Sequence, residues 1–322
     1  MARTSRYAPD RGLTVRMTVT MFLLGLVFVA FVGLLIGIMT AANASGAAIV
    51  LVALIFGGGT AIVSLFFSDK IALAAAGAVE VTPQQAPELH GIVDRLCALA
   101  DMDKPRVAIA PAQMPNAFAT GRNSKNSVLC VTEGLLSPRL GLEKEELEGI
   151  LAHELSHVAH KDVQVMTVAS LLAIVAALLV RFAFYSELFG GGRRGNDQNA
   201  FPVILIIMAV SAVVYAISFL LIRLLSRYRE LAADRSGALL TGQPSKLASA
   251  LQKVSSGMNR IPTEDLRTAQ PLNAFYFAPA MKLNAGASLS TLFSTHPSLE
   301  KRIEQLEKIQ RQLGQVTPGT PR

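Results

Sequence analysis

The chain is poor in charge for its length. Of its 322 residues, 16% are Asp, Glu, Lys or Arg, against about 25% in an ordinary globular domain. Hydrophobic residues make up 51% of the chain, and its mean hydropathy is +0.42. So few charges cannot cover the surface of a compact soluble protein, and so apolar a chain is not intrinsically disordered. The composition therefore predicts a membrane protein.

Cysteine is also scarce. The two that occur, Cys97 and Cys130, form no C-x-x-C motif, so no disulfide framework is implied and we expect both side chains to be buried. The 30 basic residues outnumber the 23 acidic ones, which gives a net charge of +7. No basic patch interleaved with aromatic residues accompanies this excess. We therefore expect no nucleic-acid partner and assign the excess to the cytoplasmic flanks of membrane spans.

Four apolar stretches are long enough to cross a hydrocarbon core, which requires about 20 residues. They occupy residues 18–39, 47–67, 165–184 and 201–225. The first resembles a signal peptide, because Arg11 and Arg16 precede it and Ala42-Asn43-Ala44 follows like a cleavage site. Its apolar run exceeds the about 7–15 residues of a signal peptide, and a second span follows at once. We expect a retained helix.

The charged flanks of the spans predict their orientation. The N-terminal tail carries four arginines, whereas the connection 41–46 carries no charge, which places the N-terminus in the cytoplasm. The fourth span ends at a further arginine cluster, again on the expected cytoplasmic side. The outer loop 186–200 fits this orientation less well, because it carries Arg193 and Arg194.

The spans divide the chain into six segments. These are a cytoplasmic N-terminal tail (1–17), a first transmembrane hairpin (18–67), a soluble part (68–164), a second hairpin (165–225), a second soluble part (226–312) and a disordered tail (313–322). The second hairpin interrupts one folded unit, provided that the two soluble parts share a site.

Hydrophobic periodicity predicts that the soluble parts are rich in helix and contain a small sheet. The expected helices are residues 86–99, 142–160, 244–255 and 297–313. The expected strands are residues 106–110 and 127–132, with 116–120 as an edge strand and 123–126 as a polar turn. The predicted fold class is therefore mainly α, a four-helix multi-pass membrane protein with a cytoplasmic α+β domain.

Residues 153–157 match the motif H-E-x-x-H. On a helix, His153 and His157 lie one turn apart on one face, so both imidazoles can bind one metal ion. Glu154 stands beside the first ligand and can act as base on the metal-bound water. The alternative, a pair of surface histidines on a solvated helix, is disfavoured because the motif rarely occurs by chance.

A catalytic zinc site needs a third protein ligand and an open position for water. Glu230 and Asp234 lie at positions i and i+4 of one helical face, and each offers a carboxylate. Such a pair is weak by itself, because carboxylates at this spacing are usually solvated. The charged residues crowded around it, at the end of a membrane helix, favour a ligand from this segment. Two other histidines, His90 and His160, are expected to be structural.

Four segments together resemble the HtpX family of bacterial membrane-bound zinc endopeptidases, which are related to the CAAX prenyl endopeptidases and to mitochondrial quality-control peptidases. The segments are residues 153–157, residues 226–234, residues 116–121, and His296-Pro297 with Arg302. The resemblance covers nearly the whole chain, including the spans, and no catalytic position looks substituted. The glycine-rich outer loop and the proline-rich C-terminus carry no motif.

The resemblance implies a role for each matching residue. His153, His157 and Glu230 would bind one Zn²⁺ per chain, with Glu154 as the general base and His296 as the group that stabilises the oxyanion. The remaining implied roles are a carboxylate that orients a ligating imidazole (Asp234), an arginine paired with that carboxylate (Arg302), and an edge strand that binds the substrate backbone (Asn116, Ala117, Phe118 and Ala119).

The resemblance also implies the activity and the location. It implies a zincin-like metalloendopeptidase of the bacterial cytoplasmic (inner) membrane, with its N-terminus and catalytic domain in the cytoplasm. Its implied partners are the lipid bilayer and membrane-protein substrates, whose misfolded or surplus copies it would cut in cytoplasmic segments as quality control, with a stress response suggested. The sequence fixes neither the substrates nor the oligomeric state.

Two other functions compete with this one. An intramembrane zinc protease would carry its motif inside a span, but here the charged run 143–148 precedes it. A transporter or structural membrane protein with an incidental metal site is disfavoured, because ion-coupled transporters hold carboxylates in their spans and these four contain no Asp, Glu or Lys. The segment 257–290, which contains three prolines, is a candidate cover for the cleft.

Overall fold

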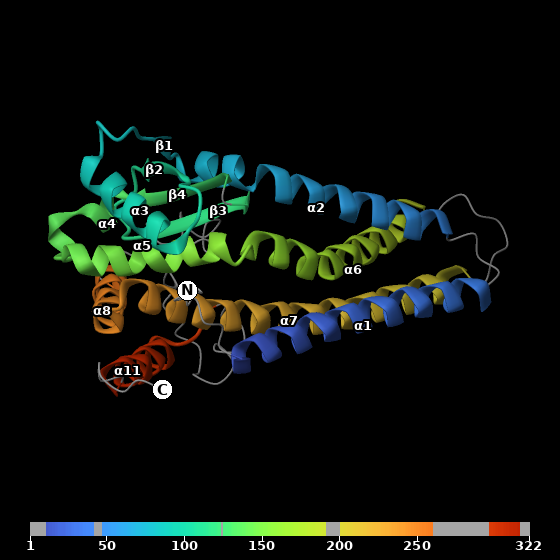
Figure 1. Ribbon diagram of the computed structural model, residues 1–322. Coiled ribbons are helices and arrows are strands. Elements are labelled where there is room, and N and C mark those ends of the chain that lie inside the picture. The colour runs from blue at the N-terminus through green and yellow to red at the C-terminus, as the bar shows by residue number, and fades with distance from the viewer. Residues whose placement is uncertain (1–10, 42–46, 124, 191–199, 260–295, 316–322) are drawn as a thin grey trace. The chain divides into compact units, whose positions relative to one another are not determined.

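The computed structural model describes residues 11–41, 47–123, 125–190, 200–259 and 296–315 (Figure 1). They divide into two compact units. We call residues 15–65 and 165–225 the helical unit, and the remaining described residues the sheet unit.

Long apolar helices make up the helical unit. The helices that contribute to it are α1 (Arg11–Ala41), α2 (Ala47–Ala76), α6 (Asp162–Gly190) and α7 (Ala200–Thr241). Within the described residues, three segments are long and apolar enough to cross a membrane, namely Arg11–Ile38, Asp162–Arg181 and Pro202–Thr241. They match the expected first, third and fourth spans. The expected second span is helical as part of α2 but is not among the three, so the count of four stays a prediction.

Side chains of the helical unit separate into a packed interior and an apolar exterior. Phe31 of α1, Leu179 of α6 and Val214 of α7 are buried in one cluster. Large apolar side chains such as Phe22 and Val29 remain mostly exposed on α1. Such a surface is unusual in a soluble protein and suits contact with lipid.

The sheet unit is built on four strands. They are β1 (Val79–Glu80), β2 (Arg106–Ala110), β3 (Ala117–Asn123) and β4 (Asn126–Thr132). Their order is β1-β2-β4-β3, with β2 parallel to β4 and the other pairs antiparallel. β3 is therefore an edge strand, as expected for residues 116–120. β3 runs to Asn123 and β4 begins at Asn126, so the strands include two of the four residues that were expected as a turn.

Both faces of this sheet are covered. Successive side chains of a strand point to opposite faces, and in β4 Leu129 and Val131 join the main core while Val128 and Cys130 pack with Ala72 of α2. Cys97 and Cys130 are both buried and free, which confirms the expectation for the cysteines.

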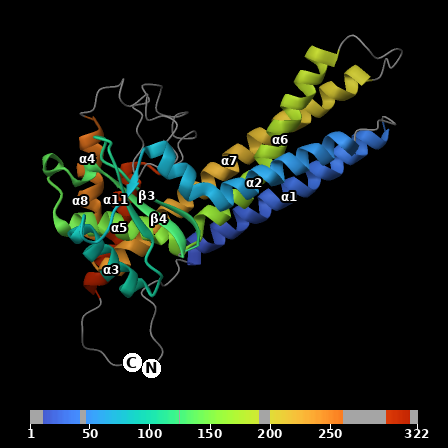
Figure 2. The same ribbon diagram turned by 90° about the horizontal axis from the view of Figure 1, so that it is seen from above.

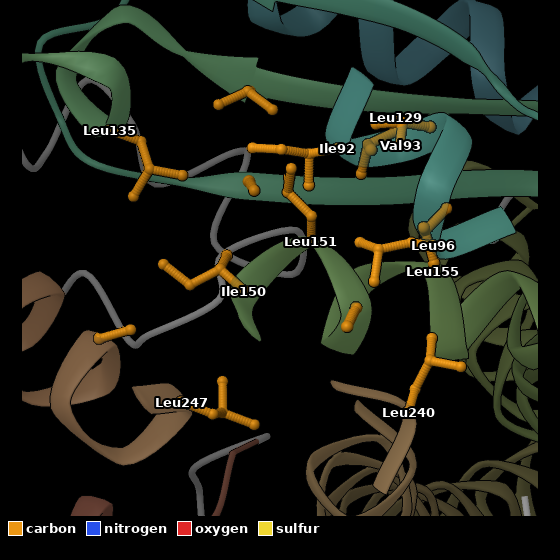
Figure 3. Packing of buried hydrophobic residues seen from close by; sticks show 14 of the residues in the cluster. Ile92, Val93, Leu96, Leu129, Leu135, Ile150, Leu151, Leu155, Leu240 and Leu247 are labelled. Carbon is orange, nitrogen blue, oxygen red and sulfur yellow. The ribbon is translucent and has the colours of Figure 1, made fainter. Parts of the chain in front are cut away.

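Five helices and a short 3-10 helix (η1) complete the sheet unit with the C-terminal end of α7. They are α3 (Pro87–Ala100), α4 (Glu133–Leu136), η1 (Pro138–Leu140), α5 (Lys144–Ala159), α8 (Pro244–Asn259) and α11 (Leu299–Gln315). α5 packs between β3 and α8, and α11 packs on α8 (Figure 1, Figure 2). Figure 3 shows the core around α5, where Leu151 and Leu155 lie close to Ile92, Val93 and Leu96 of α3.

The start of α5 is anchored to α8. The Glu146 carboxylate accepts a hydrogen bond from the Glu143 backbone N–H at 2.7 Å, which satisfies a donor at the helix N-terminus. The same buried side chain accepts from Ser249 Oγ at 2.6 Å and pairs with Lys253 Nζ at 2.7 Å. These contacts fix the helix that carries the H-E-x-x-H motif against its neighbour.

The four expected helices of the soluble parts are present, with ends shifted by a few residues. β1, α4 and η1 were not predicted, because such short elements have no hydrophobic period. The last helix extends to Gln315, so the predicted disordered tail from residue 313 begins too early, and residues 316–322 lie outside the described part of the chain. Of the candidate cover 257–290, residues 260–290 also lie outside the described part of the chain.

Candidate metal centre

Three candidate ligands converge between two helices. α5 carries His153 and His157, and α7 carries Glu230. The two Nε2 atoms of the histidines are 3.3 Å apart, and Glu230 Oε1 lies 3.4 Å from His157 Nε2. One ligand atom of each residue lies within 4.8 Å of the others. Among the described residues, these three side chains form a group that could hold a metal ion.

A glycine permits the close approach of the two helices. A Cβ atom at Gly237 of α7 would lie 2.9 Å from the backbone N and 3.1 Å from the Cα of His153. Any larger residue would push α7 away from the first histidine, and with it Glu230. This position could not be predicted from the sequence, because a single glycine within a helix does not indicate a close helix contact.

His153 belongs to a buried chain of three residues that we call the inner arm (His153, Asp234 and Arg302). Its Nδ1 lies 2.9 Å from Asp234 Oδ1. Arg302 of α11 donates to both oxygens of Asp234, from Nε and Nη2, at 2.7 Å each. The three side chains are 1%, 0% and 3% exposed. The expected pairing of Arg302 with Asp234 is thus present.

Electrostatics of the inner arm favour a neutral imidazole. Burial lowers the pKa of His153, although the hydrogen bond with Asp234 opposes this shift. A metal ion binds the deprotonated ring nitrogen of a neutral histidine. With Nδ1 committed to Asp234, Nε2 is the nitrogen that faces the other ligands.

His157 belongs to a second chain of the same kind, the outer arm (His157, Asp162 and Arg229). His157 Nδ1 lies 2.5 Å from Asp162 Oδ2, and Arg229 Nη2 lies 2.6 Å from that same oxygen. These side chains are 14%, 3% and 11% exposed. Burial alone lowers the pKa of His157, but the hydrogen bond with Asp162 and the charge of Glu230 raise it to about 9.

Asp162 and Arg229 were not predicted as site residues. The end of α5 separates Asp162 from His157, so the two share no helical face and periodicity gives no signal. Arg229 reads as one more member of the arginine cluster at the end of a membrane span. An acidic residue just past the second motif histidine was the available clue.

Glu154 lies between the ligands and the edge strand. Its side chain is buried, and Oε2 accepts a hydrogen bond from the Ala119 backbone N–H of β3 at 3.2 Å. Burial, with the nearby Glu230 carboxylate, raises the pKa of Glu154 to about 8, although the charge of His157 opposes the shift. A carboxyl group with such a pKa can both accept and return a proton near neutral pH.

His296 approaches the site from the start of the C-terminal segment. Its Nδ1 lies 2.9 Å from Glu230 Oε2, and the side chain is buried. The family resemblance implies that this residue stabilises the oxyanion. The structure brings it to the candidate ligand Glu230 through one of its two ring nitrogens.

The expected substrate-binding residues are brought to the site unequally. The Ala119 backbone faces Glu154, and Ala117 lies in the same edge strand. Asn116 precedes the strand and is bound to Thr132, whose Oγ1 accepts from the Asn116 backbone N–H at 2.8 Å. Phe118 points to the other face of the sheet, where it joins the cluster around Ala72.

The two histidines expected to be structural lie outside the ligand group. His160 Nε2 is 3.3 Å from Ser236 Oγ, and His90 Nε2 is 3.0 Å from the Val81 carbonyl oxygen. Neither belongs to the group that could hold a metal.

Two imidazoles and one carboxylate around a buried point, with a further carboxyl group beside an edge strand, define a metal-dependent peptidase. The sequence model of Peptidase family M48 matches residues 83–310, which include both arms. The chain belongs to peptidase family M48. The expected resemblance and the expected enzyme class, a metalloprotease, are therefore confirmed.

Relatives support this assignment over almost the full length. The chain is 58% identical to "Protease HtpX homolog 1" of Streptomyces coelicolor, covering 98% of this chain and 99% of that protein. It is 48% identical to "Protease HtpX homolog" of Moorella thermoacetica over 94% of this chain and 96% of that protein. It is 46% identical to "Protease HtpX homolog 2" of Methanosarcina mazei over 96% and 99%. With its apolar helices, the chain is a membrane protease.

Proposed function

We propose that the protein is a zinc-dependent endopeptidase that cuts cytoplasmic segments of misfolded or surplus membrane proteins. The observation that carries this proposal is the convergence of His153, His157 and Glu230 beside Glu154 and the edge strand β3.

The donor set fits zinc. Two imidazoles and one carboxylate are a common set in catalytic zinc sites, where they leave a fourth position open. Each imidazole is held through Nδ1 by a carboxylate, which leaves both Nε2 atoms facing Glu230. Bound zinc supplies an acidified water and polarises the substrate carbonyl.

The chain's own residues supply the proton transfer and the positioning. Glu154 would accept a proton from the attacking water and return it to the leaving amine. His296, held by Glu230, would donate to the oxygen of the scissile carbonyl as negative charge develops there.

An extended substrate fits beside β3. In the sheet of the described residues β3 stands at the edge, and a peptide can add to an edge strand by backbone hydrogen bonding. The Ala119 N–H lies on the side of the strand that faces Glu154. We infer that the scissile bond is presented in extended form and not within a helix.

The location follows from the charges that flank the spans. We propose the bacterial inner membrane, with the N-terminus and the sheet unit in the cytoplasm, because arginines cluster before the first span and after the fourth. An intramembrane protease is a weaker candidate, since α5 with its motif is not among the candidate spans of the described residues. Misfolded membrane proteins suit an enzyme that is itself embedded beside them.

Two measurements test this function. Purified protein should hydrolyse an unfolded polypeptide, stop after zinc chelation and resume when zinc is restored. In cells, a model membrane substrate with long loops on both sides should be cut in its cytoplasmic loops, as mapped by mass spectrometry. Glu154→Gln provides the inactive control. Cuts concentrated in the outer loops would contradict the proposed orientation.

A further inference from the structure

The outer arm repeats the inner arm on the second histidine. In each arm a carboxylate lies against the Nδ1 atom of a ligand histidine and is itself paired with an arginine. The family resemblance suggested the first carboxylate, Asp234. The second carboxylate, Asp162, comes from a different helix and a different part of the chain.

We propose that Asp162 is a positioning residue for zinc, holding His157 with Nε2 aimed at the metal; this rests on the proposed function of the site. An ionised carboxylate can only accept a hydrogen bond, so the hydrogen bond between Asp162 and His157 requires a proton on His157 Nδ1. In the neutral imidazole, a proton on Nδ1 leaves Nε2 deprotonated, which is the form that binds a metal ion.

A local turn brings Asp162 back to His157. α5 ends with the His160 N–H donating to the Ser156 carbonyl and the Lys161 N–H donating to the Val158 carbonyl. Lys161 then adopts a left-handed backbone, with φ of 57°, before α6 begins at Asp162. Two residues further on, Gln164 Nε2 donates to the Arg122 carbonyl at 2.5 Å, which fixes the start of α6 to β3.

The second partner of Asp162 links it to the third ligand. Arg229 directly precedes Glu230 on α7 and donates to the same oxygen of Asp162 that meets His157. One carboxylate oxygen therefore connects a ligand on α5 with the helix that carries the other protein ligand.

A simpler explanation makes Asp162 only an acidic residue at a helix N-terminus, where negative charge is favourable. That role needs no contact with an imidazole and works at the surface. Here the side chain is 3% exposed, and its Oδ2 lies 2.5 Å from His157 Nδ1 and 2.6 Å from Arg229 Nη2. Burial of a charged carboxylate is costly unless it is paired and hydrogen-bonded, and His157 is one of the two partners that Asp162 has at this oxygen.

The test measures zinc affinity of the full-length protein in detergent, by competition with a chromophoric chelator and without any substrate. Asp162→Asn should weaken zinc binding by about 10–100-fold. The matched control is Asp94→Asn, which removes an ion-paired aspartate that is 58% exposed on α3 and should leave affinity unchanged. His157→Ala should abolish binding and shows whether the metal site itself is correctly assigned.

Arg229→Gln separates positioning from simple ion pairing. If Asp162 acts through His157, Asp162→Asn should lose much more zinc affinity than Arg229→Gln. If the aspartate matters only as the partner of Arg229, both variants should lower the melting temperature of the metal-free protein alike and bind zinc like the control. That second result, with His157→Ala still unable to bind, would overturn the inference while leaving the proposed function intact.

Discussion

The inner and outer arms have the same chemistry and different surroundings. The inner arm is almost dry and depends on Arg302, which reaches the site from the C-terminal helix α11. The outer arm is more exposed and uses residues that adjoin the ligands in sequence, since Asp162 follows the motif helix and Arg229 precedes Glu230. The inner arm therefore forms only when α5, α7 and α11 have come together. The outer arm needs the turn between α5 and α6, and Arg229 of α7.

The largest effect is expected when a candidate ligand of either arm is replaced. His153→Ala and His157→Ala should both lower bound zinc and peptide hydrolysis to background, because two remaining protein ligands do not complete the site. Elemental analysis of purified protein measures the metal. His90→Ala removes another buried histidine and should retain zinc; a His157→Ala variant that binds as well as this control would remove the outer arm from the site.

The next effect separates the two carboxylates. Asp234→Asn removes the carboxylate that accepts two hydrogen bonds from the buried Arg302 and leaves the more distant Glu230, at 4.0 Å, as its nearest acidic side chain. This should destabilise the metal-free protein by about 3–5 kcal/mol. Asp162→Asn should cost less, about 1–3 kcal/mol, because Arg229 is closer to water. Chemical unfolding monitored by circular dichroism gives both values. Equal losses would mean that burial does not distinguish the arms.

A smaller effect tests the close approach of α7 to the inner arm. Gly237→Ala should destabilise the protein by about 1–3 kcal/mol, because the added methyl group meets the backbone of His153. Gly91→Ala is its control on α3, where nothing lies within 4 Å of the added atom. That change should stabilise the helix by about 0.5–1 kcal/mol. Thermal unfolding measures the stability change of each variant. A change of the same sign in Gly237→Ala and Gly91→Ala would refute the packing argument.

The smallest effect tests the turn that supports the outer arm. Lys161→Val should destabilise the protein by about 1–2 kcal/mol, because a β-branched residue is strained in the left-handed region. Lys161→Gly adopts this backbone without strain and should match the parent in zinc affinity. The two measurements are the unfolding free energy and the zinc affinity. If the valine and glycine variants agree in both, the turn does not set the geometry of Asp162.

The residues of the inner arm were predicted from the sequence, whereas Asp162 and Arg229 of the outer arm were not. The H-E-x-x-H spacing and the pair Glu230 and Asp234 are helical patterns, so one face of a helix brings each pair together. Arg302 and His296 were found through the family resemblance, because no local pattern links them to residues more than 60 positions away. Asp162 lies across a helix end, where the geometry depends on a left-handed residue that no periodicity reveals.

The fold shows the same division. Long amphipathic helices and the three apolar spans were predicted, because their periods or lengths exceed what chance composition gives. The two-residue strand β1 and the short helix α4 were missed, because tertiary contacts define them. The order of the strands could not be predicted either, because β2 pairs in parallel with β4 and not with β3, its neighbour in the chain.

The central claim is that Glu154 drives peptide hydrolysis at a zinc ion held by His153, His157 and Glu230. The most direct measurement determines zinc content and hydrolysis rate together in Glu154→Gln and in Glu145→Gln, an exposed glutamate on the same helix. The account predicts that both variants hold one zinc per chain, that Glu145→Gln keeps the parent rate, and that Glu154→Gln loses about 10²–10⁴-fold or more. A zinc-loaded Glu154→Gln variant that hydrolyses peptides at the rate of the Glu145→Gln control would contradict it.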